Sequence, residues 1–295
     1  MAFLVKALFY LIRCLPVRLA GAIGASLGRI AYLLDKRHRD IAMRNLKRIY
    51  PQQSQTWKRK ISRESFAELG RTTFEMPHVF LRSEAFLKSR IEFVGLDEVS
   101  QADADGRGVI FTACHLSNWE MGALSVSLAG FSSAQMYRAV RQQGLNSFLQ
   151  QCRERFGNQL HERNKNMRWL PKALKQGQSV SIMIDQHLST GVPVAFLGHL
   201  ARSTTLPAAY ARRNNAALFA GLVHRIGHQF RFRIEFKRIE LPQKIADTEQ
   251  DNIACSSALH DVYAEAIHAR PEQWLWIHRR WLYLDEQELS GQEQR

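Results

Sequence analysis

The sequence predicts an α/β protein in which a mostly parallel central sheet is flanked by helices, after an N-terminal helical membrane-associating segment. Short, uncharged, partly β-branched runs at residues 108–114 and 179–184 are typical of buried strands. They alternate with longer stretches typical of helices, which is the pattern of a parallel sheet covered on both faces. The chain has 295 residues without an internal repeat or a Gly/Ser-rich linker, so it is long enough for one large domain.

The N-terminal part of the chain is predicted to be helical. Residues 1–34 are rich in Leu, Ile, Ala, Phe and Tyr, and we expect them to form an apolar, basic, membrane-associating helix. Residues 37–50 form a basic helix that ends at Pro51, and residues 52–71 form another, with Pro77 expected to break the helical pattern. The domain boundaries that follow are 1–34 for the membrane-associating helix and 35–295 for a single α/β domain.

Strands and helices alternate in the rest of the chain. The expected strands are residues 91–94, 108–114, 133–137, 179–184, 217–223 and 230–239. The expected helices are residues 96–104, 121–128, 142–156, 166–175, 203–214 and 251–269, the last of them ending before Pro271. In residues 230–239 the alternating Arg, Glu and Lys side chains are expected to face water.

Most of the excess positive charge lies at the apolar N-terminal end. The formal net charge is +14, and residues 1–60 hold thirteen Lys and Arg against two acidic residues, Asp35 and Asp40. An apolar helix edged with cations lies naturally in the interface of an anionic membrane. The longest charge-free run there, residues 19–28, has ten residues and is shorter than the roughly 18–20 of a clean span, although a tilted span stays an alternative. We expect no removable signal peptide, because no short apolar core is followed by an A-x-A-like cleavage site. We expect no nucleic-acid partner, because the charge is interleaved with aliphatic residues.

Several other patterns are better explained by structure than by chemistry. The four cysteines (Cys14, Cys114, Cys152, Cys255) are far apart, so neither disulfides nor a zinc site are expected, and a reducing cytoplasmic setting fits. Cys114 could be a thiol nucleophile beside His115, but a buried strand-end residue is the preferred interpretation. Residues 24–28 match G-x-S-x-G inside an apolar helix, which indicates close helix packing rather than a nucleophile. His224 and His228 flank a turn between two strands, which favours a surface hairpin over a metal site.

The hexapeptide His115-Leu-Ser-Asn-Trp-Glu120 follows a predicted strand and leads into a predicted helix. On one continuous helix the two end side chains would lie roughly 140° apart, so they converge only if His115 lies in the turn and Glu120 in the first helical turn. A histidine beside a carboxylate is a general base with its orienting partner. Ser117 and Glu120 also fit a capping box, which would leave His115 an ordinary loop residue. The hexapeptide alone leaves both interpretations open.

Three further polar stretches lie near the ends of predicted strands or near the C-terminus. They are residues 137–141 with Arg138 and Arg141, residues 185–187 with Asp185 and Gln186, and the Trp- and Arg-rich residues 271–281. Binding sites of open α/β sheets form at such strand ends. No G-x-G-x-x-G or Walker sequence occurs, so nucleotide chemistry is not favoured.

In this order the motifs resemble the bacterial lipid A biosynthesis acyltransferases, the late (lauroyl/myristoyl) branch of the lysophospholipid acyltransferase superfamily. The resemblance runs from residues 37–46 through 115–120 to 271–281, which is most of the chain. Glutamate at position 120, rather than aspartate, resembles the lipid A branch. Ala139 departs from the proline that the family often has, and Phe196-Leu-Gly198 departs from its usual double phenylalanine.

The resemblance implies an O-acyltransferase that moves a fatty acyl chain from an acyl carrier protein thioester to a hydroxyl of a lipid A precursor. It implies the cytoplasmic face of a bacterial inner membrane, with acyl carrier protein, anionic membrane lipid and the lipid acceptor as partners. No metal and no cofactor beyond the acyl-carrier co-substrate are expected. The alternatives are a coenzyme A donor, another acceptor such as a glycolipid, amino-acid lipid or lysophospholipid, and a catalytically silent membrane-binding protein.

The resemblance also suggests roles for residues of the site. His115 would take the proton of the acceptor hydroxyl, and Glu120 would fix the imidazole tautomer. Arg138 or backbone N–H groups at the helix start would stabilise the tetrahedral intermediate, and arginines would bind a phosphorylated headgroup. Asp185 is expected near the site, with its role, structural or catalytic, open. The candidate substrate-binding residues are Asn118, Arg138, Arg141, Arg155, Asp185 and Gln186.

Overall fold

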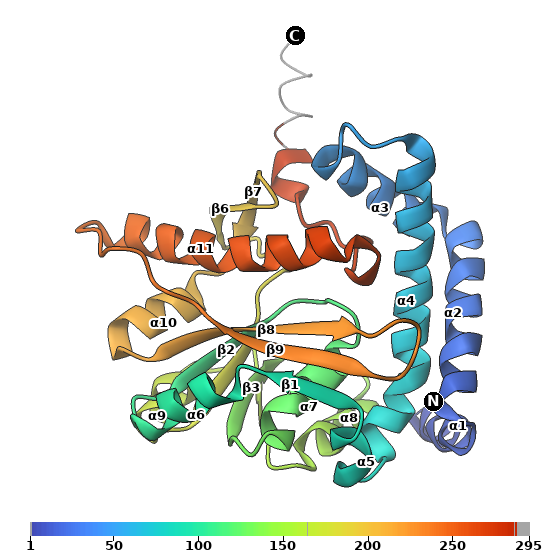
Figure 1. The fold of residues 1–295 in the computed structure, drawn as a ribbon, viewed down its shortest axis with the longest axis horizontal. Helices are drawn as coiled ribbons and strands as arrows, with labels where there is room; N and C mark the ends of the chain where they lie inside the picture. The colour runs from blue at the N-terminus through green and yellow to red at the C-terminus, as the bar shows by residue number, and fades with distance from the viewer. Residues whose placement is uncertain (1, 164, 286, 288–295) are drawn as a thin grey trace.

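The computed structural model describes residues 2–163, 165–285 and 287 of the chain. It confirms the predicted α/β class with a mostly parallel central sheet (Figure 1). The sheet has seven strands in the order β1-β9-β8-β2-β5-β3-β4. Its strands are β1 (Ile91–Val94), β2 (Val109–Ala113), β3 (Ser133–Tyr137), β4 (Gln159–Glu162), β5 (Ser179–Met183), β8 (Ala217–Arg225) and β9 (Phe232–Arg238).

The centre of the sheet is a block of parallel strands in which β2 lies between β8 and β5. The strand β9 runs antiparallel to β8, as the predicted hairpin requires, and β1 pairs with β9 in parallel. Because β2 and β5 are parallel neighbours, the residues that follow them meet at one edge of the sheet. A separate antiparallel hairpin, β6 (Val192–Phe196) and β7 (His199–Ser203), and the short strand β4 were not predicted.

Helices cover both faces of the sheet (Figure 1). On one face α9 (Trp169–Lys175), α10 (Leu206–Asn214) and α11 (Thr248–Ala269) pack over Ile110 and Val180. On the other, α6 (Leu96–Ala104), α7 (Trp119–Leu128) and α8 (Gln143–Glu154) pack over Val109 and Phe111. The remaining short helices are α5 (Glu84–Lys88) and the 3₁₀ turn η1 (Pro271–Gln273).

The N-terminal helices differ from the prediction in two respects. The apolar segment is two helices, α1 (Ala2–Cys14) and α2 (Val17–Leu34), and Pro16, which has no N–H to continue α1, precedes the second. After α3 (Lys36–Ile49), helix α4 (Gln55–Leu81) continues through Pro77, so the predicted break there was wrong. The buried side chains of residues 78–80 pack into the core, and this packing outweighs the hydrogen bond that the proline removes.

Helix α2 lies along α4 with glycine backbones in contact (Figure 1). A Cβ atom at Gly24 would lie 2.3 Å from the Gly70 carbonyl oxygen, and one at Gly28 would lie 2.1 Å from that of Phe66. Any side chain would therefore push the two helices apart, and this confirms close packing as the meaning of residues 24–28. Arg29 of α2 also pairs with Glu64 of α4 at 2.8 Å.

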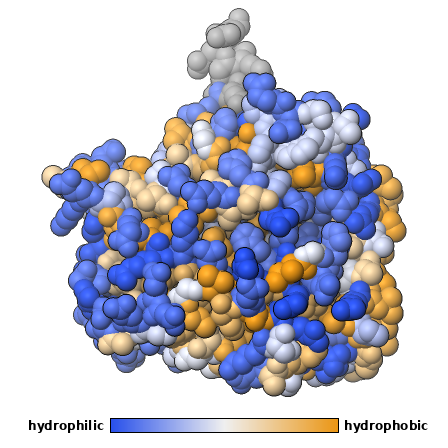
Figure 2. All heavy atoms as spheres, viewed as in Figure 1, coloured by the Kyte–Doolittle hydropathy of each residue, from blue (hydrophilic) through white to orange (hydrophobic). Residues whose placement is uncertain are grey.

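The outer face of the N-terminal helices is apolar and exposed. By length and composition, α2 could cross a membrane, but α4 occupies one of its faces. Figure 2 shows apolar side chains gathered along the edge of the molecule where α2 lies. The large exposed apolar residues of α1 and α2 are Phe3, Leu4, Leu8, Tyr10, Leu11, Leu19, Ile23, Leu27, Ile30, Leu33 and Leu34.

Candidate active site

The site lies at the edge of the sheet where β2 and β5 end. His115 follows β2, and Asp185 follows β5, so these residues are 70 positions apart in the chain but adjacent in space. The imidazole Nδ1 is 2.8 Å from Oδ1 of Asp185, while the backbone N–H of His115 donates to Oδ2 of the same carboxylate at 2.8 Å. The indole N–H of Trp274 donates to Oδ2 as well, at 2.9 Å. One buried carboxylate thus fixes both the main chain and the ring of His115.

The two groups shift each other's pKa in opposite directions. Burial disfavours the imidazolium, but the Asp185 carboxylate outweighs this effect and raises the pKa of His115 above its ordinary value. Burial also opposes ionisation of Asp185, yet His115 and the Trp274 N–H hold the pKa of that carboxyl well below its usual range. The ionised Asp185 accepts the Nδ1 proton, so Nε2 carries the lone pair of the neutral ring.

Nε2 of His115 faces a cavity of about 430 Å³. The side-chain amide of Gln186 lies 3.2 Å from Nε2, and the Trp119 ring packs edge-on against the imidazole with centroids 5.2 Å apart. The cavity extends between α7 and the sheet, because Phe111 and Val126 line it together with His115 and lie farther along β2 and α7. Apolar side chains contribute much of its wall, among them Phe111, Val126, Ile182, Ile184, Val223, Ile234 and Phe236. A volume in this range suits a small-molecule or acyl ligand.

Glu120 was expected to fix the tautomer of the His115 imidazole, but the ring is hydrogen-bonded to Asp185 instead. The Glu120 carboxylate is held by Arg153 of α8, which donates from Nε at 2.9 Å and from Nη2 at 2.5 Å. Burial lowers the pKa of Arg153, but the Glu120 carboxylate outweighs it and raises that pKa. Glu120 lines the cavity and contributes to the raised pKa of His115 through space. No sequence motif pointed to Arg153, which lies 33 residues away from Glu120 on an amphipathic helix.

Asn118, the last residue of the 115–118 turn between β2 and α7, caps the N-terminus of α7. The Asn118 side chain accepts from the backbone N–H of Met121 at 3.1 Å, as an N-cap residue does. The capping box of Ser117 and Glu120 is absent, because the Ser117 hydroxyl donates to Glu68 of α4 instead. Asn118 is fully buried and is not part of the cavity wall, so it does not fit the predicted substrate-binding role.

The predicted arginines divide into one at the cavity and two away from it. Arg138 is exposed and lines the cavity, together with Arg163, which was not predicted. Arg141 is exposed but does not line the cavity. Arg155 lies away from it, since its guanidinium donates to the Phe80 carbonyl and stacks 4.4 Å over the Phe156 ring. Arg138, Arg141 and Arg155 were expected to bind one phosphorylated headgroup together, but of these three arginines the structure places only Arg138 at the cavity.

The C-terminal segment, residues 271–281, packs against the main chain beside His115 and Asp185. Trp274 pairs with Leu116 in a single β-bridge, and the backbone N–H of Leu275 donates to the His115 carbonyl at 3.2 Å. The guanidinium of Arg280 is fully buried and donates to the Gln186 carbonyl at 3.2 Å. Burial lowers the pKa of His278 to about 4, so that its neutral ring accepts the His187 backbone N–H. The Trp- and Arg-rich residues 271–281 therefore hold the residues that flank His115 and Asp185.

Cys114 is buried, as preferred from the sequence. Burial and the neighbouring Asp185 raise the pKa of its thiol well above the ordinary value, which makes it a poor nucleophile. Within residues 2–163, 165–285 and 287, no group of three or more His, Cys, Asp or Glu side chains is placed to hold a metal ion.

Known proteins similar to this chain share one class of chemistry. The sequence model of the family described as bacterial lipid A biosynthesis acyltransferase matches residues 1–283. The Lipid A biosynthesis palmitoleoyltransferase of Escherichia coli is 26% identical over 270 residues, which cover 90% of this chain and 86% of that protein. The Lipid A biosynthesis lauroyltransferase of the same species is 25% identical over 275 residues, which cover 92% of this chain and 88% of that protein. The Phosphatidylinositol mannoside acyltransferase of Mycobacterium tuberculosis is 26% identical over 226 residues, which cover 75% of this chain and 69% of that protein.

Proposed function

The chain belongs to the bacterial lipid A biosynthesis acyltransferase family, and from this premise we propose that it transfers a fatty acyl chain from an acyl carrier protein thioester to a hydroxyl of a lipid A precursor. The observation that supports the proposal is the His115–Asp185 pair, whose histidine lines a largely apolar cavity. A base beside a pocket for a hydrocarbon chain is what O-acylation of a lipid needs.

The reaction follows from the orientation of the imidazole. Nε2 of His115 takes the proton of the acceptor hydroxyl while the hydroxyl oxygen attacks the thioester carbonyl. The tetrahedral intermediate collapses, the carbon–sulfur bond breaks, and the imidazolium returns the proton to the leaving thiolate. Asp185 stabilises the imidazolium and keeps Nε2 free for the acceptor, which would take the place of the Gln186 amide.

The remaining polar groups of the cavity have supporting roles in this proposal. Arg138 and Arg163 at the cavity wall would bind a phosphate of the acceptor, since guanidinium groups bind phosphate in a bidentate manner. Glu120, held by Arg153, adds negative potential that favours the imidazolium. This charge would support the proton transfer without contact to the ring.

The apolar part of the cavity would hold the acyl chain, and this suggests a test of chain length. Gly122 and Val223 both line the cavity, and a Cβ atom at Gly122 would lie 2.6 Å from Cγ2 of Val223. We expect Gly122→Ala to narrow the cavity and to lower kcat/KM for the longest accepted chain by about tenfold, the effect of roughly one methylene. The shortest accepted chain serves as the internal control in the same assay. An equal loss for all chain lengths would contradict this role of the cavity.

The proposed location is the cytoplasmic face of the bacterial inner membrane. The exposed apolar face of α1 and α2 would enter the interface, and the basic residues of the N-terminal end would contact anionic headgroups. Because α4 covers the other face of α2, an interfacial position is favoured over a separate span. The same positive charge would attract the acidic acyl carrier protein.

The decisive experiment supplies donors and acceptors separately to membranes that contain the full chain. Thioesters of acyl carrier protein and of coenzyme A, each with several chain lengths, are offered with a lipid A precursor or another glycolipid. Mass spectrometry should show one added acyl chain on the lipid A precursor with the carrier-protein donor. Acylation of only the other glycolipid would overturn the acceptor, transfer from coenzyme A alone would overturn the donor, and no transfer would overturn the activity.

A further inference from the structure

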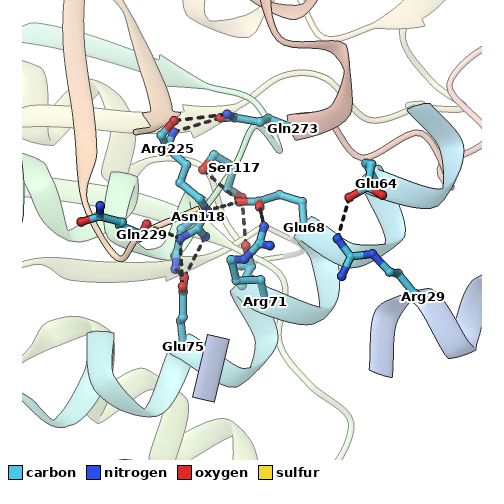
Figure 3. A network of polar contacts seen from close by, with 11 residues as sticks. Arg29, Glu64, Glu68, Arg71, Glu75, Ser117, Asn118, Arg225, Gln229 and Gln273 are labelled. Atoms are coloured by element: carbon cyan, nitrogen blue, oxygen red, sulfur yellow. Dashed lines mark hydrogen bonds and ion pairs between the residues drawn. The ribbon is translucent and has the colours of Figure 1, made fainter. Parts of the chain in front are cut away.

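A cluster of buried charges contacts the 115–118 turn (Figure 3). None of its charged residues lines the cavity. Glu68 and Glu75 come from one face of α4, and Arg225 is the last residue of β8. Arg225 donates from Nε to Glu68 at 2.6 Å, and its two Nη atoms donate to the two oxygens of Glu75 at 2.8 Å each. All three side chains are at most 7% exposed. The hairpin turn that follows Arg225 is exposed at residues 226–229, as expected for a surface hairpin, whereas Arg225 itself is buried.

The cluster holds the turn through two neighbouring side chains. The Ser117 hydroxyl donates to Glu68 at 3.2 Å, and the Asn118 amide donates to Glu75 at 3.0 Å. Thr72, which lies between the two glutamates on α4, donates to the Ser117 carbonyl at 3.3 Å. Ser117 and Asn118 follow His115 by only two and three residues, so a shift of the cluster would move the histidine.

The turn needs such support because its backbone is strained. Ser117 has a φ of 51°, which L-residues other than Asn and Asp adopt rarely. The C-terminal segment holds the turn from the other side, where the Ser117 N–H donates to the Gln273 carbonyl at 2.7 Å. The Gln273 side chain in turn accepts the backbone N–H of Arg225 at 2.9 Å. The strained residue is thus bound to α4, to β8 and to the C-terminal segment at once.

Stability alone is a weak reason for this arrangement. Desolvation of buried charges can exceed their mutual attraction, and well-packed apolar residues often serve stability better. Burial raises the pKa of Glu75 despite the bidentate contact with Arg225. The cluster is also closed off by α2, since a Cβ atom at Gly21 would lie 3.0 Å from Oε1 of Glu75. The membrane-facing helix therefore covers the groups that hold the turn.

We infer that Glu68, Glu75 and Arg225 are positioning residues, which fix the 115–118 turn so that His115 stays hydrogen-bonded to Asp185. The inference rests on the proposed function, in which His115 is the base. The residues do not touch the cavity and take no part in the proton transfer. They act through Ser117 and Asn118, which set the position of the main chain.

The first test breaks one contact and leaves the helix cap intact. Asn118→Asp keeps an oxygen for the Met121 N–H but turns the donor toward Glu75 into a repelling acceptor. We expect kcat to fall by about 10- to 100-fold, the effect of a small displacement of a catalytic group, with little change in KM for the donor. As His115 moves from Asp185, the acid limb of the kcat/KM profile should shift to lower pH. A merely structural role would lower the amount of folded enzyme without moving that limb.

A second substitution should rescue the first. Combining Asn118→Asp with Glu75→Gln exchanges donor and acceptor at this contact and keeps the net charge. We expect the double variant to recover at least about tenfold in kcat relative to Asn118→Asp. Asn166→Asp is the matched control, because Asn166 is exposed and its side chain likewise accepts a backbone N–H, that of Arg168. It should keep the wild-type kcat and pH profile.

A further variant covers the case in which Asn118→Asp does not fold. Ser117→Gly relieves the positive φ and removes the hydroxyl that contacts Glu68, so it should fold and still show a lower kcat with the same shift of the acid limb. Wild-type kcat and an unmoved limb in the folded variants would overturn the inference. If the wild-type chain shows no acyl transfer, the proposed function fails instead, and if the chain stays active without His115, the role of His115 as the base fails.

Discussion

Replacement of Asp185 by asparagine is expected to lower kcat by about 10²- to 10⁴-fold while the fold is retained. The carboxylate accepts the Nδ1 proton of His115, the backbone N–H of His115 and the Trp274 N–H. An asparagine can keep the last two contacts with its oxygen, but its amide then faces Nδ1. The ring would adopt the opposite tautomer, which places a proton on Nε2 where the base needs its lone pair.

The pH dependence of kcat/KM gives a second test of the His115–Asp185 pair, because the direction in which its acid limb shifts can be predicted. The neutral imidazole is the active base, so kcat/KM should fall as the pH drops through the pKa of His115, which Asp185 raises. In Asp185→Asn this acid limb should move to lower pH, because the attraction that favours the imidazolium is gone. Glu120→Gln should move it less, since Glu120 has no hydrogen bond to the ring. The exposed Asp261→Asn is the control, and an Asp185→Asn variant with wild-type kcat would disprove the role of the pair.

Replacement of His115 by alanine should abolish acyl transfer, with kcat reduced by at least about 10³-fold. Within the described part of the chain, no other imidazole forms a hydrogen bond with Asp185, and burial lowers the pKa of the nearby His278 to about 4. The cavity and the Asp185–Trp274 contact should persist, so membrane association and the unfolding temperature should change little. Turnover is measured by mass spectrometry of the acceptor lipid.

His228→Ala serves as the matched control for this variant, because His228 is exposed and its imidazole does not line the cavity. Retention of near wild-type turnover by His115→Ala would rule out the base mechanism. The proton of the acceptor hydroxyl would then have to be taken by another group, whereas absence of acyl transfer by the wild-type chain would favour the alternative of a catalytically silent membrane-binding protein.

The order and type of the elements were largely readable from the sequence. The strands at 91–94 and 133–137 match the predicted bounds, because apolar runs between turn residues define short buried strands well. The hairpin of β6 and β7 and the edge strand β4 were missed because their apolar and polar residues do not alternate clearly. Pro77 was misinterpreted because its cost is local, whereas the packing that offsets it is tertiary.

The site was predictable only in part, because pairing depends on strand order. The placement of His115 at a strand end followed from its local sequence, but nothing local says that β2 lies beside β5. For this reason Glu120, five residues away, was preferred over Asp185 as the partner of His115. The roles of Arg153 and of the α4 glutamates could not be predicted from the sequence either, because charged residues on a helix usually face water.

The glycine contact of α2 with α4 has a practical consequence for handling the protein. Cutting the chain before residue 35 would not simply release a soluble enzyme from an anchor. It would uncover the backbone around Gly70 and remove Gly21 from above the buried carboxylate of Glu75, so water could reach charges that the native fold keeps dry. The first helices are therefore better kept than deleted, because one side of α2 packs against the interior of the protein while the other side is apolar and exposed.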